Sequence, residues 1–455
     1  MHIALTHGYF LAEDPKEKEI MRPYVPLGLL YISAYLEKQH VTHTVYDTTF
    51  STFDDLTAYL LTERPQLLGL YVNLMTRKNI LRVIRFIRET DALRNMHIVL
   101  GGPEVRNHAG HFLEFGADYL VLGEGEQTFY ELAMYLAAEQ KGAPLHIHGL
   151  AFRGMDKEVV FTSEREKLKD LDTLPFPNRK KVDLHAYLQA WKNKHGRNAI
   201  SVSTMRGCPY TCKWCSRAVY GLSYRRRSPE QVVQELMEIQ KEYAPDTIWF
   251  VDDVFTISHV WLKGFHDAIK ANNLQIAYEC ITRADRMNAE VIQLLRDSGC
   301  FRVWIGAESG SQKIIDAMDR RVDVQQVRDM IRMTRAHGME AGTFIMLGYP
   351  GETEADIEET IRHLKASEPD HFTITLAYPI KGTELYTETE SVFTSVPDWA
   401  TGSDREIDFK RNYSKRFYHY AVRRVVNEVQ YHKTKKTGFK IKSIGAKTGM
   451  FLSKW

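Results

Sequence analysis

The chain has 455 residues, enough for two or three domains, and its hydrophobic (44%) and charged (26%) contents are those of an ordinary globular protein. A formal net charge of +2 gives no global attraction to nucleic acid. No apolar run reaches the roughly eighteen residues of a membrane-spanning helix, and the N-terminal MHIALTHGYF lacks the regions of a signal peptide. We therefore expect a cytoplasmic protein without a nucleic-acid partner.

Residues 1–142 alternate short apolar runs with longer amphipathic ones. Strands are predicted at 2–7, 43–48, 67–73, 97–103 and 118–126, and helices at 26–39, 53–64, 78–90 and 126–140. Strands that alternate with helices favour a parallel, doubly wound, Rossmann-like sheet, whose ligands bind beyond the carboxyl ends of the strands. Gly101 and Gly102 follow one strand and would let a flat ligand approach the backbone, although an ordinary turn explains such a pair equally well.

Four stretches of this region carry a family resemblance. They are YVPLGLLYISAYLEKQH, LLGLYVNLMT, IVLGGPEV and ADYLVLGEGEQTF. Their order resembles that of the cobalamin-binding domain that precedes many radical S-adenosylmethionine (SAM) enzymes. The resemblance implies that the Gly-Gly strand lines the slot for the nucleotide tail of the corrinoid. The cobalamin-binding residues that it implies are Thr76, Gly101, Gly102, Glu124 and Gly125.

One strand end departs from the cobalamin mutases and their relatives. Their Asp-x-His-x-x-Gly loop supplies a histidine that binds cobalt from below, whereas here Asp47 is followed by Thr49 at the histidine's place. The sequence therefore offers no lower histidine ligand. His7 and His43 would serve only if loops brought them close, and we expect both to be ordinary core or surface histidines.

Residues 143–195 are predicted to link two domains. The stretch GLAFRGMDKEVVF, residues 149–161, has the pattern of a small hairpin that turns at 154–157. The stretch that follows it contains two prolines and no periodicity, which is typical of a linker.

Three of the five cysteines lie in MRGCPYTCKWCSR, as Cys208, Cys212 and Cys215. They follow a predicted strand, and the carboxyl ends of strands carry the chemistry of α/β barrels. Several basic residues nearby favour the thiolate form that metals need, namely Arg206, Lys213, Arg217 and Arg225 to Arg227. Three thiolates fit a zinc ion with a fourth ligand, such as His195 or His259, or a [4Fe–4S] cluster with one open iron.

The spacing C-x3-C-x2-C, with Trp214 before the last cysteine, resembles the signature of radical SAM enzymes. The resemblance implies that Cys208, Cys212 and Cys215 hold a [4Fe–4S] cluster, whose open iron binds the amino and carboxylate groups of SAM. It implies an electron donor such as flavodoxin or ferredoxin. One electron then splits SAM into methionine and a 5′-deoxyadenosyl radical.

Residues 196–385 continue the alternation of strands and helices. Strands are predicted at 199–205, 247–255, 276–283, 302–309, 341–350 and 372–379, with helices at 228–243, 258–273, 288–299, 310–318 and 353–367. Six β/α units predict a partial, open barrel of the TIM type. Polar residues gather at its strand ends: Asp252, Asp253, Arg283, Glu308 and Ser309. The resemblance implies that these residues and Trp214 contact SAM, with Arg283 on its carboxylate and Glu308 on its ribose or amine.

Residues 386–455 are predicted to form a helical C-terminal region. Phe417, Ala421, Val425 and Val429 recur every four residues and would face a core. We expect this region to cover the barrel mouth and shape the substrate pocket. The last stretch, HKTKKTGFKIKSIGAKTGMFLSKW, carries seven lysines and no acidic residue. It could rest peripherally on an anionic membrane, or form a basic tail that covers the barrel or is disordered.

The resemblance as a whole predicts a cobalamin-dependent radical SAM enzyme that acts on a small biosynthetic substrate. One possible outcome is methylation of an unactivated carbon. Another is a cobalamin-assisted oxidation, cyclisation or rearrangement without methyl transfer. A non-enzymatic iron–sulfur or corrinoid sensor is the alternative from another class, and the polar strand ends argue against it.

Overall fold

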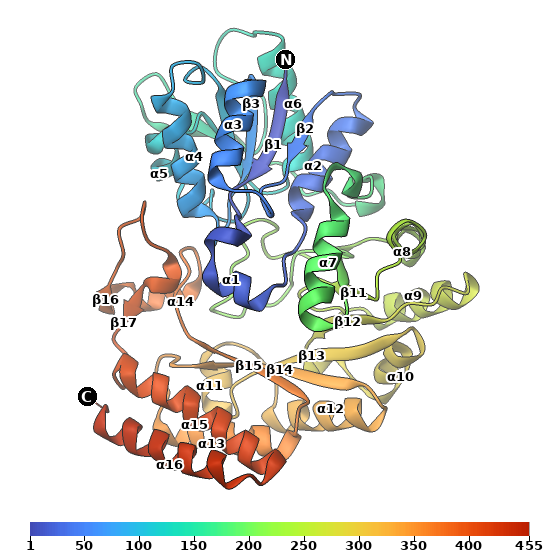
Figure 1. Cartoon of the computed structure of the whole chain (residues 1–455), viewed down its shortest axis with the longest axis vertical. Coiled ribbons are helices and arrows are strands. Elements are labelled where there is room, and N and C mark those ends of the chain that lie inside the picture. The colour runs from blue at the N-terminus through green and yellow to red at the C-terminus, as the bar shows by residue number, and fades with distance from the viewer. Residues whose placement is uncertain (455) are drawn as a thin grey trace.

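The N-terminal part of the computed structural model, which describes residues 1–454, is built on a parallel sheet (Figure 1). All five residues of the apolar strand β1 (Ile3–His7) are buried, as expected for a central strand covered on both faces. The parallel strands beside it are β2 (Thr44–Tyr46), β3 (Leu67–Tyr71), β4 (His97–Gly101) and β5 (Tyr119–Val121). The strand order β2-β1-β3-β4-β5 is flavodoxin-like, with its ligand crevice at the β1/β3 switch point.

Two apolar layers flank this sheet. One contains side chains from α2 (Leu27–Lys38) and α6 (Gly125–Ala137). The other contains side chains from α3 (Phe53–Glu63), α4 (Arg77–Glu89) and α5 (Ala109–Phe115). A short helix, α1 (Pro15–Ile20), lies in the loop after β1. The predicted doubly wound architecture is confirmed.

The predicted hairpin is also present, as β6 (Leu150–Arg153) and β7 (Val159–Phe161). It pairs antiparallel with β5 and extends the first sheet to seven strands. This pairing favours placing the end of the N-terminal domain after Phe161, whereas 142 was expected. The domain boundaries remain predictions. A helix that the sequence did not indicate, α7 (Leu184–His195), occupies the rest of the linker.

The second sheet is an open half-barrel. Its six parallel strands are β8 (Ala199–Val202), β11 (Thr247–Phe250), β12 (Tyr278–Thr282), β13 (Cys300–Glu308), β14 (Glu340–Leu347) and β15 (His371–Leu376). They lie side by side in chain order, and no pairing between β15 and β8 closes the described sheet. The predicted partial barrel of six β/α units is confirmed.

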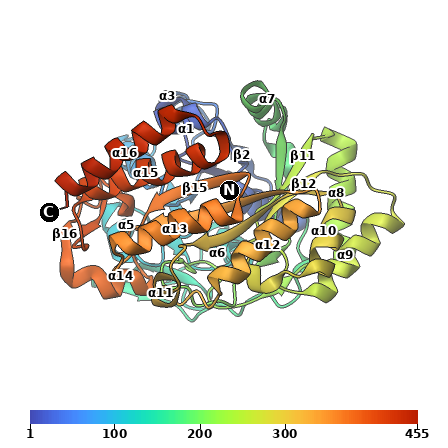
Figure 2. The same ribbon diagram turned by 90° about the horizontal axis from the view of Figure 1, so that it is seen from below.

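Helices form the outer layer of the half-barrel (Figure 2). They are α8 (Pro229–Tyr243), α9 (His259–Ala271), α10 (Ala289–Asp297), α11 (Gln312–Ala317), α12 (Val324–Ala336) and α13 (Glu354–Ser367). Helix α12 has no counterpart among the helices predicted from the sequence. Ser228 caps α8 by accepting a hydrogen bond from the backbone N–H of Gln231, as its S-P-E pattern suggests.

The chain ends in two antiparallel helices, α15 (Lys415–Thr434) and α16 (Thr437–Leu452). The predicted apolar stripe of α15 is fully buried, at Phe417, Ala421, Val425 and Val429. The pair packs on α13, in the outer layer of the half-barrel. This position does not match the expectation that these helices cover the barrel mouth. Among the described residues, no helix is both long and apolar enough to span a bilayer.

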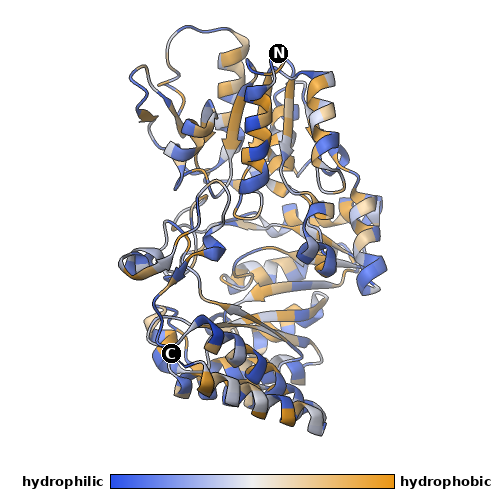
Figure 3. Cartoon of the chain, turned by 60° about the vertical axis from the view of Figure 1, so that its left-hand side comes forward, coloured by the Kyte–Doolittle hydropathy of each residue, from blue (hydrophilic) through white to orange (hydrophobic). Residues whose placement is uncertain are grey.

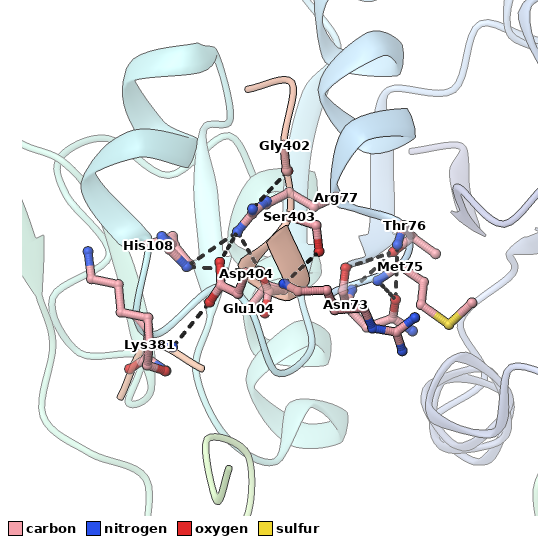
Figure 4. Close-up of polar contacts among 12 residues, drawn as sticks. Asn73, Met75, Thr76, Arg77, Glu104, His108, Lys381, Gly402, Ser403 and Asp404 are labelled. Atoms are coloured by element: carbon pink, nitrogen blue, oxygen red, sulfur yellow. Dashed lines mark hydrogen bonds and ion pairs between the residues drawn. The ribbon is translucent and has the colours of Figure 1, made fainter. Parts of the chain in front are cut away.

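The segment between β15 and α15 reaches back to the N-terminal domain instead. It holds α14 (Glu384–Thr389), β16 (Phe393–Ser395) and β17 (Asp408–Phe409). Arg77, 1% exposed at the start of α4, donates to Glu104 (3.0 Å), Asp404 (3.1 Å) and the carbonyl of Gly402 (2.9 Å) (Figure 4). Trp399 packs beside the same cluster, with its ring 4.9 Å from that of His111. We call this contact the Arg77 clamp.

Candidate functional site

The three clustered cysteines follow β9 (Met205–Arg206), a short strand beyond β8, and all are free thiols. Gly207 makes the turn into the loop with φ +84°, and a Cβ there would lie 2.3 Å from Oγ of Ser223. Two buried guanidinium groups contact the loop. Nη1 of Arg283 and Nη1 of Arg320 each donate to Sγ of Cys212 at 3.7 Å. These donors favour a negatively charged sulfur at Cys212.

The expectation that nearby basic residues favour the thiolates is wrong for two of the cysteines. Burial, with the charge of Asp253, raises the pKa of the Cys215 thiol to about 12, and burial also raises the pKa of Cys208. The nearby arginines are paired with carboxylates instead: Arg206 and Arg225 with Glu124, Arg226 with Asp252, and Arg227 with Glu235. A coordinated metal ion would supply the positive charge that deprotonates these thiols.

The donor set fits an iron–sulfur cluster. Within residues 1–454, no three or more His, Cys, Asp or Glu side chains surround a single metal position. His195 and His259 bond elsewhere, to the carbonyls of Ile20 (3.0 Å) and Arg286 (3.3 Å). In a [4Fe–4S] cluster each thiolate binds a different iron, so three sulfurs on one loop need not converge on one point.

Arg283 directly follows β12 and lies beside the cysteine loop. Its guanidinium stacks 3.8 Å from the ring centre of Tyr210. Besides its contact with Cys212, Nε donates to Asp285 (2.8 Å) and Nη2 to the carbonyl of Arg320 (2.7 Å). The structure therefore places Arg283 at the loop with all three nitrogens engaged, and its implied contact with the SAM carboxylate remains a prediction.

Glu308 ends β13 at a bulge, with φ +65°. A left-handed conformation costs a non-glycine residue about 1–3 kcal/mol, and such residues gather at functional sites. Its side chain is 13% exposed, and its carboxylate lies 3.8 Å from Nη2 of Arg320. Burial raises the pKa of Glu308, and Arg320 opposes that shift. Glu308 thus presents a carboxylate with one distant partner, as a binder of an amine or a ribose requires.

The remaining strand-end residues separate into two kinds. Asp252 is 2% exposed and accepts from the backbone N–H of Thr204 (2.7 Å) and Met205 (3.2 Å), so it fixes the turn between β8 and β9. Ser309 is equally buried, and its Oγ accepts from the N–H of Ser311 (3.1 Å). Both side chains hold the backbone in place, and Asp252 also lines the cavity of about 220 Å³ that is described next.

Asp253 and Trp214 are placed differently. Asp253 is exposed and lines a cavity of about 220 Å³ together with Gly207, next to Cys208. We call it the loop cavity. Trp214 is half-buried, with the Arg320 guanidinium 5.8 Å from its ring centre. These two residues remain available for contact with a ligand.

A second cavity, also of about 220 Å³, lies between the first sheet and helices α2 and α6. Six glycines are among its lining residues, namely Gly28, Gly69, Gly101, Gly102, Gly123 and Gly125. A Cβ on Gly69 would lie 2.7 Å from Leu5, and one on Gly102 would lie 2.3 Å from the carbonyl of Val72. We call this the glycine cavity. Its bare backbone and apolar floor fit a flat aromatic group such as the nucleotide tail of a corrinoid.

Four of the five predicted cobalamin residues line the glycine cavity, and Thr76 does not. Oγ1 of Thr76 accepts from the N–H of Asn73 (3.0 Å) in the turn before α4 (Figure 4). Thr76 lines a third cavity, of about 590 Å³, where the strand ends of the first sheet face β8 and β11. Gly28 lines all three cavities, so they adjoin one another.

The candidate cobalt ligands are engaged within the protein. Nε2 of His7 bonds to Asp47 (2.9 Å), and its Nδ1 accepts from the N–H of Tyr9 (3.2 Å). Nε2 of His43 bonds to Ser33 (2.7 Å). Both histidines are buried, as expected for structural residues.

Arg206 is a residue whose place the sequence analysis missed. It lines both the glycine cavity and the loop cavity, and its guanidinium lies 5.4 Å from the ring centres of Tyr31 and Tyr220. The sequence showed it only as one of several positive charges near the cysteines. Arg320 was also missed, because it follows a helix and lies at no strand end.

Comparison with known proteins agrees with this geometry. The family model of the radical SAM superfamily matches residues 202–364, and that of the B12 binding domain matches residues 20–133. An uncharacterized methyltransferase of Pyrococcus horikoshii is 28% identical over 368 residues, which cover 79% of this chain and 77% of the relative. The anaerobic magnesium-protoporphyrin IX monomethyl ester cyclase of Synechocystis is 26% identical over 370 residues, covering 79% and 72%.

Among solved structures, the fold is similar to that of TsrM from Kitasatospora setae, a radical S-adenosylmethionine methyltransferase with tryptophan substrate and a SAM analogue bound. The TM-score is 0.72 at 18% sequence identity, and the match covers 87% of this chain and 79% of TsrM. Each of the two matching family models falls on one of the two sheets described above. This chain therefore belongs to the radical SAM enzymes that carry an N-terminal B12-binding domain.

Proposed function

We propose that this protein is a cobalamin-dependent radical SAM methyltransferase that methylates an unactivated carbon of a small biosynthetic molecule. The observation that carries this proposal is the position of Arg206. One side chain lies in the walls of both the glycine cavity and the loop cavity. A corrinoid site and a cluster site at these places would be immediate neighbours, as a reaction that uses both cofactors on one substrate needs.

In this proposal Cys208, Cys212 and Cys215 would hold a [4Fe–4S] cluster, which would supply an electron for the cleavage of SAM. Arg283 and Arg320 stabilise the sulfur of Cys212 through their N–H groups.

The residues proposed to contact SAM directly are Trp214, Asp253, Arg283 and Glu308. Asp252 and Ser309 position the strand ends from which these contacts come.

Gly101, Gly102, Glu124 and Gly125 are the proposed cobalamin residues, with the nucleotide tail in the glycine cavity. Bound cobalamin would supply a metal that can carry a methyl group. The engaged state of His7 and His43 supports a corrinoid without a histidine ligand from this chain. The electron would come from a small donor such as flavodoxin or ferredoxin, and we place the reaction in the cytoplasm.

The proposal is tested with anaerobically reconstituted protein, a reductant, SAM with an isotope-labelled methyl group, and metabolite extract from a deletion strain. We expect 5′-deoxyadenosine together with a product that carries the label. The Cys212→Ala protein is the control and should give neither. Absence of 5′-deoxyadenosine from the wild-type protein would contradict the radical SAM activity itself.

A second candidate function is a radical cyclisation or oxidation without methyl transfer. The similarity to the Synechocystis cyclase favours keeping it. In the same experiment this function gives 5′-deoxyadenosine and a changed substrate without the label. Methyl transfer and cyclisation therefore differ in where the label is found.

A further inference from the structure

The outer face of α16 carries large apolar side chains that no other part of the described chain covers. Ile441 is 65% exposed, Ile444 57%, Phe451 76% and Leu452 77%. Ser443, Ala446 and Met450 on the opposite side of the helix are buried against α15. At 100° per residue the four exposed residues form one stripe. Single apolar residues exposed on a surface need no explanation, but a continuous exposed stripe indicates a binding face.

Lysines flank this stripe. Lys435, Lys436, Lys442 and Lys447 are exposed, and none of them forms an ion pair with an acidic residue in the part of the chain that the structure describes. On the helical wheel, Lys442 lies on one side of the stripe and Lys447 on the other. Lysines in this position can extend along an apolar surface and keep their charge in water or at lipid headgroups.

The charge of this region differs from that of the whole chain. Residues 410–455 contain 13 lysines and arginines and one acidic residue, Glu428. Because the whole chain has a net charge of only +2, the rest of it is net acidic. Figure 1 shows α15 and α16 side by side at the far end of the molecule from the N-terminal sheet. Figure 3 shows apolar residues interspersed with polar ones along these helices.

We propose that the exposed face of α16 docks on a lipid bilayer that contains anionic phospholipids. The apolar stripe inserts at the boundary between headgroups and acyl chains, and the lysines contact the anionic headgroups. Both the apolar stripe and the lysines are needed. The stripe is short and would bind a bilayer weakly by itself, and the lysines alone would bind any polyanion. The stripe lies outside the half-barrel, so docking leaves the three cavities free. The proposed site is therefore independent of the reaction.

The test is sedimentation of the full-length protein with vesicles of phosphatidylcholine, alone or with phosphatidylglycerol. We expect binding to rise at least tenfold with phosphatidylglycerol. Ile444→Ser/Phe451→Ser should lose binding to both vesicles. Lys442→Gln/Lys447→Gln should lower the affinity for vesicles with phosphatidylglycerol about 30-fold, since each lysine contributes a factor of roughly five. Binding to vesicles of phosphatidylcholine alone should not change. All replaced side chains are exposed, so circular dichroism and the thermal midpoint should stay at wild-type values.

Two matched controls separate this face from the general surface. Val260→Ser replaces an apolar side chain on α9 that is 86% exposed, and Lys141→Gln/Lys169→Gln removes two exposed lysines elsewhere. Both controls should bind vesicles as the wild type does. Equal loss in the controls, or no dependence on phosphatidylglycerol, would overturn the proposal. So would a dimer in light scattering that Ile444→Ser/Phe451→Ser dissociates, because a second copy would then cover the stripe.

Discussion

Arg206 and Glu124 join the two domains of the molecule: Nη1 of Arg206, in β9, donates to Oε1 of Glu124, before α6, at 3.0 Å. Arg206 lies two residues before Cys208, and Glu124 lies in the wall of the glycine cavity. The other carboxylate oxygen accepts from the backbone N–H of Leu168 in the linker (2.9 Å). One carboxylate therefore connects the N-terminal domain, the linker and the cysteine loop.

Arg206→Gln should destabilise the protein by about 3 kcal/mol, because it leaves the buried carboxylate of Glu126 without its ion-pair partner, whereas Glu124 keeps Arg225. Urea unfolding followed by circular dichroism measures the change. Arg94→Gln is the control, because Arg94 pairs with Asp91 on the surface and its loss should cost less than about 1 kcal/mol. Equal effects of both changes would show that Arg206 is no more than a surface contact.

Cys212→Ala should abolish the binding of iron, because a cluster held by the two remaining thiolates lacks the ligand that Arg283 and Arg320 support. Corrinoid binding should persist, because the glycine cavity lies in the other domain. Iron analysis and visible absorption measure the two separately. Cys300→Ala, a buried cysteine in β13, should keep its iron. Loss of both cofactors from Cys212→Ala would refute the separation of the sites.

Gly101→Leu should lower corrinoid binding at least tenfold and leave the iron content unchanged. A Cβ at Gly101 meets its first neighbour at 3.9 Å, so the backbone tolerates the side chain, which would then fill the cavity. Equilibrium binding of hydroxocobalamin measures the effect. The control is Gly438→Leu, where a Cβ would meet nothing within 4 Å and no cavity is lined. Unchanged affinity in Gly101→Leu would place the corrinoid elsewhere.

Arg320→Gln should lower the midpoint potential of the reconstituted cluster by about 50–100 mV. The change removes a positive charge and an N–H donor from the sulfur of Cys212. Both of these groups stabilise the more negative, reduced cluster, so their loss makes reduction harder. A redox titration followed by electron paramagnetic resonance measures the potential. Arg321→Gln alters the exposed neighbour, which pairs with Asp319, and should leave the potential unchanged. A potential that does not move in Arg320→Gln would exclude this role.

Glu104→Gln should remove a pH dependence of stability at the Arg77 clamp. Burial raises the pKa of Glu104 from 4.5 to about 7, and the charge of Asp404 adds to this while Arg77 opposes it. Between about pH 4.5 and 7 the unfolded chain releases this proton before the folded chain does, so stability falls as the pH rises. Between pH 4.5 and pH 8, the free energy of unfolding of Glu104→Gln should therefore rise by about 2–3 kcal/mol relative to that of the wild type.

Thermal or urea unfolding at several pH values measures this difference. Burial lowers the pKa of His108 to about 4, which gives the opposite slope below pH 6.5. That contribution is common to both proteins and cancels when they are compared. Exposed Glu114 provides the control, since Glu114→Gln should follow the wild-type curve. If stability depended on pH in the same way in Glu104→Gln and in the wild type, Glu104 would not be the group responsible.

Local sequence patterns predicted most of the fold but could not orient side chains at strand ends. Apolar patterning identified all the parallel strands, both the central ones such as β1, which is buried throughout, and the partly exposed edge strands β2 and β15. Asp252 and Asp253 look alike in sequence. Adjacent residues of an extended chain point in opposite directions, so Asp252 is buried in the turn and Asp253 is exposed, although both line the loop cavity. Only the position of the next strand decides which one points inward.

Contacts between distant parts of the chain could not be predicted from the sequence, because local patterns carry no information on them. Arg206 and Glu126 are 80 residues apart, and Arg77 and Asp404 are 327 apart. Charged residues are frequent, and nothing local marks which pair will meet after two domains have packed. The three cysteines were identifiable because all of them lie in one short segment, where spacing itself carries the information.

The Arg77 clamp bears on how a large ligand can enter the molecule. The N-terminal domain is attached to the half-barrel through the linker that contains α7, through the pair of Arg206 with Glu124, and again through Arg77, Glu104 and Asp404. A body fastened at several separate points cannot swing open about any one of them as a hinge. A bulky ligand of the adjoining cavities must therefore either enter by an unfastened side or arrive before residues 399–404 have docked. In the second case loading would be part of the folding sequence, and release would require the clamp to break.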